Sequence, residues 1–197
     1  MGATTGARMS SQDSTLIYSI DAGMSRFTIK AFATGLLSGF GHDPTLVVRA
    51  FSGDAKFSAD ALDDASLQMS IRADSLTVGD DVSQKDRQEI ETRMKSDVLE
   101  TSRFPEIAFA SSKISASKLG EGRYNVAITG DLSMHGVTQS LTFNAQVVVN
   151  GATLRGFGDF SVRQTDYDIA LVSVAGGTLK VKDEIKVTFD ILARKQS

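Results

Sequence analysis

The sequence predicts an all-β protein of antiparallel strands with one short surface helix. Apolar and polar residues alternate with a period of two over long segments, which is typical of strands with one buried and one solvent-exposed face. Antiparallel sheets produce this pattern, because parallel sheets are usually buried on both faces. The 17 glycines separate the alternating segments at short intervals, and only one segment has the composition of a helix.

The first fifteen residues are small and polar, so we expect residues 1–15 to form a disordered N-terminal tail. No linker divides the rest of the chain, which predicts a single β domain over residues 16–195. The start of the chain lacks the continuous apolar core of a secretory signal, and no run reaches the roughly 18–20 apolar residues of a membrane span. As the chain reads, the expected location is cytoplasmic; it is periplasmic if a native signal is missing from this sequence.

Strands are predicted through most of the first half of the chain. Alternating residues occupy 26–31 and 67–73, and a longer continuous run extends over 45–57. A further strand over 107–111 follows Pro105 and places its apolar residues on one face.

One segment, residues 83–96, has no strand pattern. It is rich in helix-forming residues and contains neither glycine nor proline. Ser83 can cap its N-terminus with Asp86 at the third helical position, and opposite charges four residues apart, such as Lys85 and Glu89, support a helix. Its apolar stripe is thin, so we expect a short surface helix that adds little to the core.

The second half alternates most clearly, over 124–132, 140–149 and 184–191. A further strand over 153–163 carries two glycines two residues apart, which predicts a bend or a close backbone approach. We expect about eight to ten strands in all. They must close on themselves or pair into two sheets, because open sheet edges invite aggregation.

Composition excludes several classes of function. The chain has no cysteine, which excludes disulfides, thiolate metal sites and a cysteine nucleophile. Its formal net charge of −3 and the absence of a basic run argue against nucleic-acid binding.

The two histidines, His42 and His135, both fall in predicted turns. A zinc site needs three or four ligands at short spacing, and no HxH or HExxH motif is present, so we predict no metal site. The sequence contains no GxSxG elbow, no Walker loop and no dinucleotide-binding fingerprint, and its neighbouring acidic residues establish no acid–base pair. We therefore expect no cofactor and no enzyme activity.

Phenylalanine occurs 11 times and tryptophan never. Most of these rings lie on the apolar faces of predicted strands, where they form either a packed core or the wall of a lumen. An eight-stranded barrel can hold one small or slender ligand. Composition alone leaves both interpretations open.

Several short motifs occur in a familiar order. Residues 104–111 read FPEIAFAS and residues 130–138 read GDLSMHGVT, and three weaker elements precede them at 18–27, 51–53 and 74–76. In these motifs the chain resembles the YceI-like family of bacterial polyisoprenoid-binding proteins, from about residue 18 to about residue 192. The loop at 39–44 departs from the commonest family pattern.

The resemblance implies a lipocalin-like, extended antiparallel β-barrel of about eight strands with one short helix. It also implies that the protein binds and sequesters or transports a long apolar isoprenoid lipid, a polyprenyl chain or an isoprenoid quinone, in the barrel lumen. On this interpretation the polar rim of the lumen contains His42, Arg49 and His135. The residues expected to line the lumen are apolar residues of the alternating strands: Phe27, Ile29, Phe51, Phe57, Met69, Ile71, Phe109, Ile128, Leu132, Phe143, Val147, Val187 and Phe189.

Two alternatives remain at this point. One is a lipid-acting enzyme with His42 and His135 at the barrel mouth. The other is a solid-core barrel that acts as an interaction module. The expected partner is an isoprenoid lipid, and the sequence leaves a homodimer open.

Overall fold

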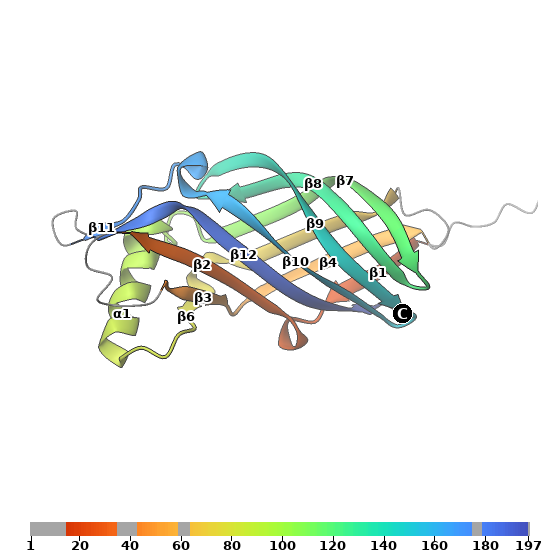
Figure 1. Ribbon diagram of the computed structural model, residues 1–197, viewed down its shortest axis with the longest axis horizontal. Coiled ribbons are helices and arrows are strands. Elements are labelled where there is room, and N and C mark those ends of the chain that lie inside the picture. The colour runs from red at the N-terminus through yellow and green to blue at the C-terminus, as the bar shows by residue number, and fades with distance from the viewer. Residues whose placement is uncertain (1–14, 35–42, 59–63, 175–178, 197) are drawn as a thin grey trace, which may run out of the picture.

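The computed structural model describes residues 15–34, 43–58, 64–174 and 179–196, which form a β-barrel with one α-helix (Figure 1). The predicted all-β class is therefore confirmed. Residues 1–14 of the predicted tail and His42 lie outside the described residues, whereas Thr15 already belongs to a strand. The elements in chain order are β1 Thr15–Ile20, β2 Arg26–Thr34, β3 Thr45–Val48, β4 Phe51–Ser58, β5 Ser66–Arg72, β6 Leu76–Val78, α1 Gln84–Arg93, β7 Glu106–Gly120, β8 Arg123–Met134, β9 Val137–Asn150, β10 Thr153–Arg163, β11 Ser173–Val174 and β12 Leu179–Lys195.

Eight strands close the barrel in the order β1-β4-β5-β7-β8-β9-β10-β12. All of their pairings are antiparallel, and the circle is completed where β1 pairs with β12, from Tyr18 opposite Lys195 to Ile20 opposite Ala193. This closure settles the choice between a barrel and two packed sheets. It also removes the open edges that an eight-stranded sheet would otherwise expose.

Three of the barrel strands continue past a break. β12 pairs with β1 over its last residues and with β2 over residues 180–190, so β2 prolongs the line of β1. In the same way β3 prolongs β4 and β6 prolongs β5, as the β2–β3 and β3–β6 pairings show. The run over 45–57, predicted as one segment, is therefore split at Arg49 and Ala50, because its two halves pair with different strand segments.

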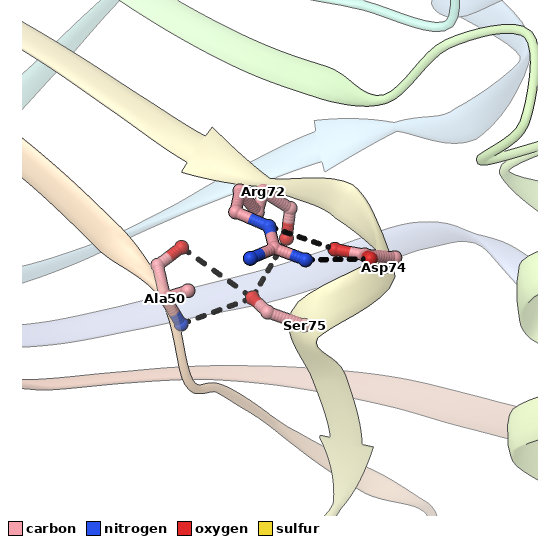
Figure 2. Close-up of polar contacts among 4 residues, drawn as sticks. All are labelled: Ala50, Arg72, Asp74 and Ser75. Carbon is pink, nitrogen blue, oxygen red and sulfur yellow. Dashed lines mark hydrogen bonds and ion pairs between the residues drawn. The ribbon is translucent and has the colours of Figure 1, made fainter.

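Hydrogen bonds join the breaks in two neighbouring strands. Ser75 lies in the short 3-10 turn Ala73–Ser75 between β5 and β6. Its Oγ accepts from the N–H of Ala50 at 3.0 Å and donates to the carbonyl of Arg72 at 2.7 Å (Figure 2). Arg72 also forms an ion pair with Asp74 at 2.8 Å. Ser75 thus links the break between β3 and β4 to the turn between β5 and β6, so the two neighbouring strands are interrupted side by side.

The predicted surface helix is present as α1. The Oγ of Ser83 accepts a hydrogen bond from the N–H of Asp86 at 3.1 Å, which confirms the predicted cap. α1 contains no buried residue, in agreement with its thin apolar stripe. The α-helix ends at Arg93, and the chain continues in a π-helical turn, Met94–Val98, which buries Met94 against the barrel.

The turn between β8 and β9 has a backbone conformation that favours glycine. His135 and Gly136 connect β8 to β9 with φ of 53° and 77°. Positive φ at both central residues defines the type I′ turn, whose twist matches that of the flanking strands. The GDLSMHGVT motif at residues 130–138 therefore contains a tight hairpin turn.

Candidate functional site

The barrel encloses an apolar cavity of about 170 Å³. The cavity lies in the half of the barrel away from α1, because its wall includes residues next to the ends of the β4–β5, β7–β8 and β9–β10 hairpins, such as Ala65, Tyr124 and Leu154. Figure 1 shows these hairpins at the end opposite α1. The wall is almost entirely apolar, so a ligand there meets carbon rather than hydrogen-bonding groups.

Most of the residues expected to line a lumen reach this cavity. Ile29, Phe51 and Val187 do not; they belong to the packed core beside it. The predicted residues that line the cavity are Phe27, Phe57, Met69, Ile71, Phe109, Ile128, Leu132, Phe143, Val147 and Phe189. Whether they contact a ligand stays a prediction.

A cluster of aromatic rings bounds the cavity. Phe143 is the central ring of this cluster. The centroid of its ring lies 4.8 Å from that of Phe160, 5.6 Å from that of Phe109 and 5.8 Å from that of Phe189. Phe189 in turn packs on Phe27 at 5.9 Å. These rings come from β2, β7, β9, β10 and β12, so the cluster joins five strands of the barrel.

The described residues in the half of the barrel near α1 form a packed core. Its buried residues Leu76, Met94, Leu99, Tyr167 and Ile169 belong to the core and do not line the cavity. Met94 and Leu99 come from the turn after α1, and Tyr167 from a 3-10 turn after β10. The described part of the barrel thus contains both a packed core and an apolar cavity.

A tyrosine braces the other end. Tyr18 is 1 % exposed, and its ring stacks on Phe57 with centroids 5.4 Å apart. Its hydroxyl donates to the carbonyl of Gly151, in the β9–β10 turn, at 2.7 Å. Burial raises the pKa of Tyr18, so the hydroxyl keeps the proton that it donates. This contact ties β1 to the β9–β10 hairpin, which lies on the far side of β12.

Sequence reasoning missed part of the lining, above all on β7. The predicted strand placed Ile107 and Phe109 inward, and alternation from there would place Ile114 and Ala116 outward. A register shift between Ser111 and Lys113 reverses the alternation, so Ile114 and Ala116 line the cavity. A bulge inserts one unpaired residue. Its trace in the sequence is the change of the apolar positions from 107 and 109 to 114 and 116.

The predicted polar rim does not form around this cavity in the described residues. Arg49 is exposed at the break between β3 and β4, where its Nε donates to Thr77 Oγ1 at 3.0 Å. His135 lies in the β8–β9 turn and is not part of the cavity wall. His42 cannot be placed, since it lies outside the described residues.

His135 has structural partners on three sides. Its Nδ1 is 3.1 Å from the carbonyl oxygen of Tyr167, and its Nε2 is 3.3 Å from Glu100 Oε2. The ring packs on Phe104 with centroids 4.5 Å apart. These contacts join the hairpin turn to the segments after α1 and after β10, and they account for the histidine without chemistry on a ligand.

The described residues contain no group of three or more histidine, cysteine, aspartate or glutamate side chains that could hold a metal ion. No helix in that same part of the chain is long and apolar enough to cross a bilayer.

Comparison with known proteins gives one family match over most of the chain: the family model for the YceI-like domain matches residues 18–193. A UPF0312 protein of Shewanella baltica is 30 % identical over 101 residues, which are 51 % of this chain and 48 % of the relative. The chain thus aligns with about half the length of the curated relatives it matches.

Solved structures show the same fold at low identity. Burkholderia cenocepacia BcnA is 20 % identical with a TM-score of 0.66, over 88 % of this chain and 98 % of that one. A polyisoprenoid binding domain from Saccharophagus degradans, implicated in plant cell wall breakdown, is 16 % identical with a TM-score of 0.66, over 92 % of this chain and 99 % of that domain. The YCEI protein of Campylobacter jejuni is 13 % identical with a TM-score of 0.55, over 77 % of this chain and 85 % of that one.

Proposed function

This chain belongs to the YceI-like family, and on that premise we propose that it binds an isoprenoid lipid in the barrel cavity and sequesters or carries it without catalysing a reaction. The observation that carries the proposal is the nearly all-apolar wall of the cavity. Such a wall suits a hydrocarbon chain, because almost all of the surface that it offers is carbon. The polyisoprenoid-binding structural relative supports the same class of ligand.

Binding in this cavity would draw on the hydrophobic effect. Each Å² of apolar surface removed from water contributes about 25 cal/mol. A chain that buries several hundred Å² would gain on the order of 10 kcal/mol before the costs of association. The tail would therefore supply most of the affinity, and the head group little.

The volume sets the length of chain that fits. The cavity of about 170 Å³ is close to the roughly 150 Å³ of an engineered apolar cavity that admits benzene. A long polyprenyl chain thus needs more room than is open here. It would gain that room if the rings around Phe143 rotate, or it would leave part of its length outside the mouth.

The test fills the cavity from a position where the wall is small. Ala116 lines the cavity on β7, whereas Ala110 on the same strand is exposed and does not line it. We expect Ala116→Phe to weaken binding of geranylgeraniol at least about tenfold, because the new ring occupies the space of the chain. Ala110→Phe, the matched control, should bind as the wild type does.

Isothermal titration calorimetry measures the affinity, and mass spectrometry of the organic extract of gently purified protein identifies any lipid that copurifies. A stoichiometric isoprenoid in the wild-type extract, lost in Ala116→Phe, would support the proposal. Absence of binding in the wild type after incubation with isoprenoid alcohols and quinones would overturn it and favour an interaction module. Turnover of the added lipid would instead favour an enzyme.

A further inference from the structure

The end of the β7–β8 hairpin carries positive charge on a chain that is negative overall. Residues 113–124 contain Lys113, Lys118 and Arg123 but a single acid, Glu121, whereas the whole chain has a formal net charge of −3. Within the described ranges none of these three basic side chains forms an ion pair. Their charge is therefore available to a partner.

Exposed apolar side chains lie beside this charge. Leu119, near the hairpin tip, is 57 % exposed, and Val148 and Phe157 on β9 and β10 are 37 % and 36 % exposed. The pairing connects them: Gly120 pairs with Arg123, Arg123 pairs with Val148, and Val148 pairs with Arg155, two residues before Phe157. Of the five large exposed hydrophobic residues in the described part of the chain, three thus lie along this one wall.

The same hairpin extends beyond β5 at one side of the cavity. β5 pairs with β7 only up to Gln68 opposite Ala110, and the N–H of Leu67 instead donates to the Ser111 side chain at 2.8 Å. Among the described residues no strand covers the β5 side of β7 beyond that point. The inner face of this overhang contributes Ile114, Ala116 and Tyr124 to the cavity wall.

We propose that this hairpin end, defined by Lys113, Lys118, Leu119, Arg123 and Val148, docks on the surface of an anionic lipid bilayer. The basic side chains would contact the lipid phosphates while Leu119 enters the interfacial region, as basic and apolar residues do in membrane-surface proteins. Docking at this end would bring the part of the cavity wall that the hairpin forms close to the bilayer, so an isoprenoid would have a short path between the two. This last step rests on the proposed function; the docking itself does not.

Other roles explain only part of the pattern. Lysines along the unpaired edge of β7 would discourage strand pairing with another chain. That role accounts for Lys113 and Lys118, but not for a leucine more than half exposed at the tip or for Arg123 on the neighbouring strand. The combination of unpaired basic charge and exposed apolar surface fits an anionic bilayer.

The test is flotation of the full chain with vesicles of phosphatidylcholine, with or without a quarter of phosphatidylglycerol. We expect binding that needs phosphatidylglycerol and weakens at high salt, because each basic residue near an anionic surface contributes about a fivefold factor. The variant Lys118→Glu/Leu119→Asp should bind at least about tenfold more weakly. If the first variant does not fold, the milder variant Lys118→Gln/Leu119→Ser replaces it in the same test.

The matched control is Lys85→Glu/Leu171→Asp, which makes the same charge change at exposed positions away from the hairpin. It should bind vesicles as the wild type does. No wild-type binding to the anionic vesicles, or equal loss in the control, would overturn the docking. So would a wild-type dimer in light scattering that the hairpin variant dissociates, since the surface would then pair with a second copy.

Titration of the hairpin variant with geranylgeraniol in vesicle-free buffer separates the two proposals. If the hairpin variant still binds geranylgeraniol but no longer binds vesicles, the result supports both the proposed function and the docking. If neither the variant nor the wild type binds the alcohol, the proposed function fails, whereas vesicle binding still decides the docking.

Discussion

Glu91 on α1 accepts a hydrogen bond from the backbone N–H of Val78 on β6, with its Oε1 2.9 Å from the nitrogen. β6 is the last strand in the sheet order of the described residues, and no other strand among them pairs with this N–H. Arg87, one turn earlier on α1, donates to the carbonyls of Val78 and, at 2.9 Å, Asp80. Side chains of the helix thus take the place of a neighbouring strand and protect the open edge.

The Glu91–Val78 contact predicts a stability effect. Glu91→Ala should lower the free energy of unfolding by about 1–3 kcal/mol, because it leaves a half-buried backbone donor without a partner. Urea denaturation measures this. The control is Glu89→Ala. Glu89 is exposed, and its ion pair with Arg93 is long at 4.0 Å, so the substitution should lower the free energy of unfolding by less than about 0.5 kcal/mol. Equal losses would contradict a specific role for Glu91.

Truncating the central ring of the aromatic cluster should both destabilise the barrel and enlarge the cavity. Phe143→Ala removes three ring contacts and should cost about 3–5 kcal/mol. Because the space opens inside the apolar wall, a saturating isoprenoid alcohol should raise the melting temperature of the variant more than that of the wild type. Phe157→Ala, on the outer face of β10, should cost less than about 1 kcal/mol and leave the ligand response unchanged. An unaltered ligand response in Phe143→Ala would argue against ring displacement as the source of room.

Close backbone packing around Gly130 predicts a steric effect. A Cβ at Gly130 would lie 2.4 Å from the carbonyl oxygen of Ala110 and 2.6 Å from the ring of Phe109. Gly130→Ala should therefore lower the free energy of unfolding by about 1–3 kcal/mol. Gly120→Ala is the comparison, since nothing lies within 4 Å of its Cβ position. Thermal or urea denaturation of the two variants would measure the difference in stability. Similar stabilities would contradict the close packing of Ala110 and Phe109 around Gly130.

Asp183 should contribute to acid sensitivity. The N–H and hydroxyl of Thr165 donate to its carboxylate at 2.9 and 2.8 Å, and Arg163 lies 3.1 Å away. These contacts, the Thr165 N–H foremost, lower the pKa of Asp183 in the folded state. A lowered folded-state pKa gives stability that is present above the unfolded pKa of about 3.9 and is lost as the pH falls further.

The corresponding experiment is unfolding as a function of pH. The stability of Asp183→Asn should fall less steeply than that of the wild type below about pH 4, with the two slopes alike at neutral pH. Asp97→Asn supplies a control, because this exposed aspartate accepts a hydrogen bond from its neighbour Ser96 and from no other residue in the described part of the chain. Identical acid slopes in Asp183→Asn and the wild type would rule out this contribution.

The sequence by itself determined the local structure. Alternation with a period of two depends only on neighbouring residues, so the strands of the second half, the Ser83 cap and the boundaries of β10 could be predicted. The order of the FPEIAFAS and GDLSMHGVT motifs further indicated the barrel and the family, which the structure and the family match confirm.

Only the tertiary structure decided features that depend on pairing between distant strands. The split at Arg49 and Ala50 follows from which strands each half meets, and the shift after Ser111 follows from the register between β7 and β8. Both change which side chains face inward without altering the local composition.

The placement of the site was decided in the same way. Phe51 and Phe143 both lie on the apolar faces of predicted strands, yet of these two only Phe143 lines the cavity, whereas Phe51 packs against the core. His135 lies in a motif that suggested a ligand rim, and the fold instead places Glu100, Phe104 and Tyr167 around it. Such contacts join residues up to 35 positions apart, where the periodicity of a single segment carries no information.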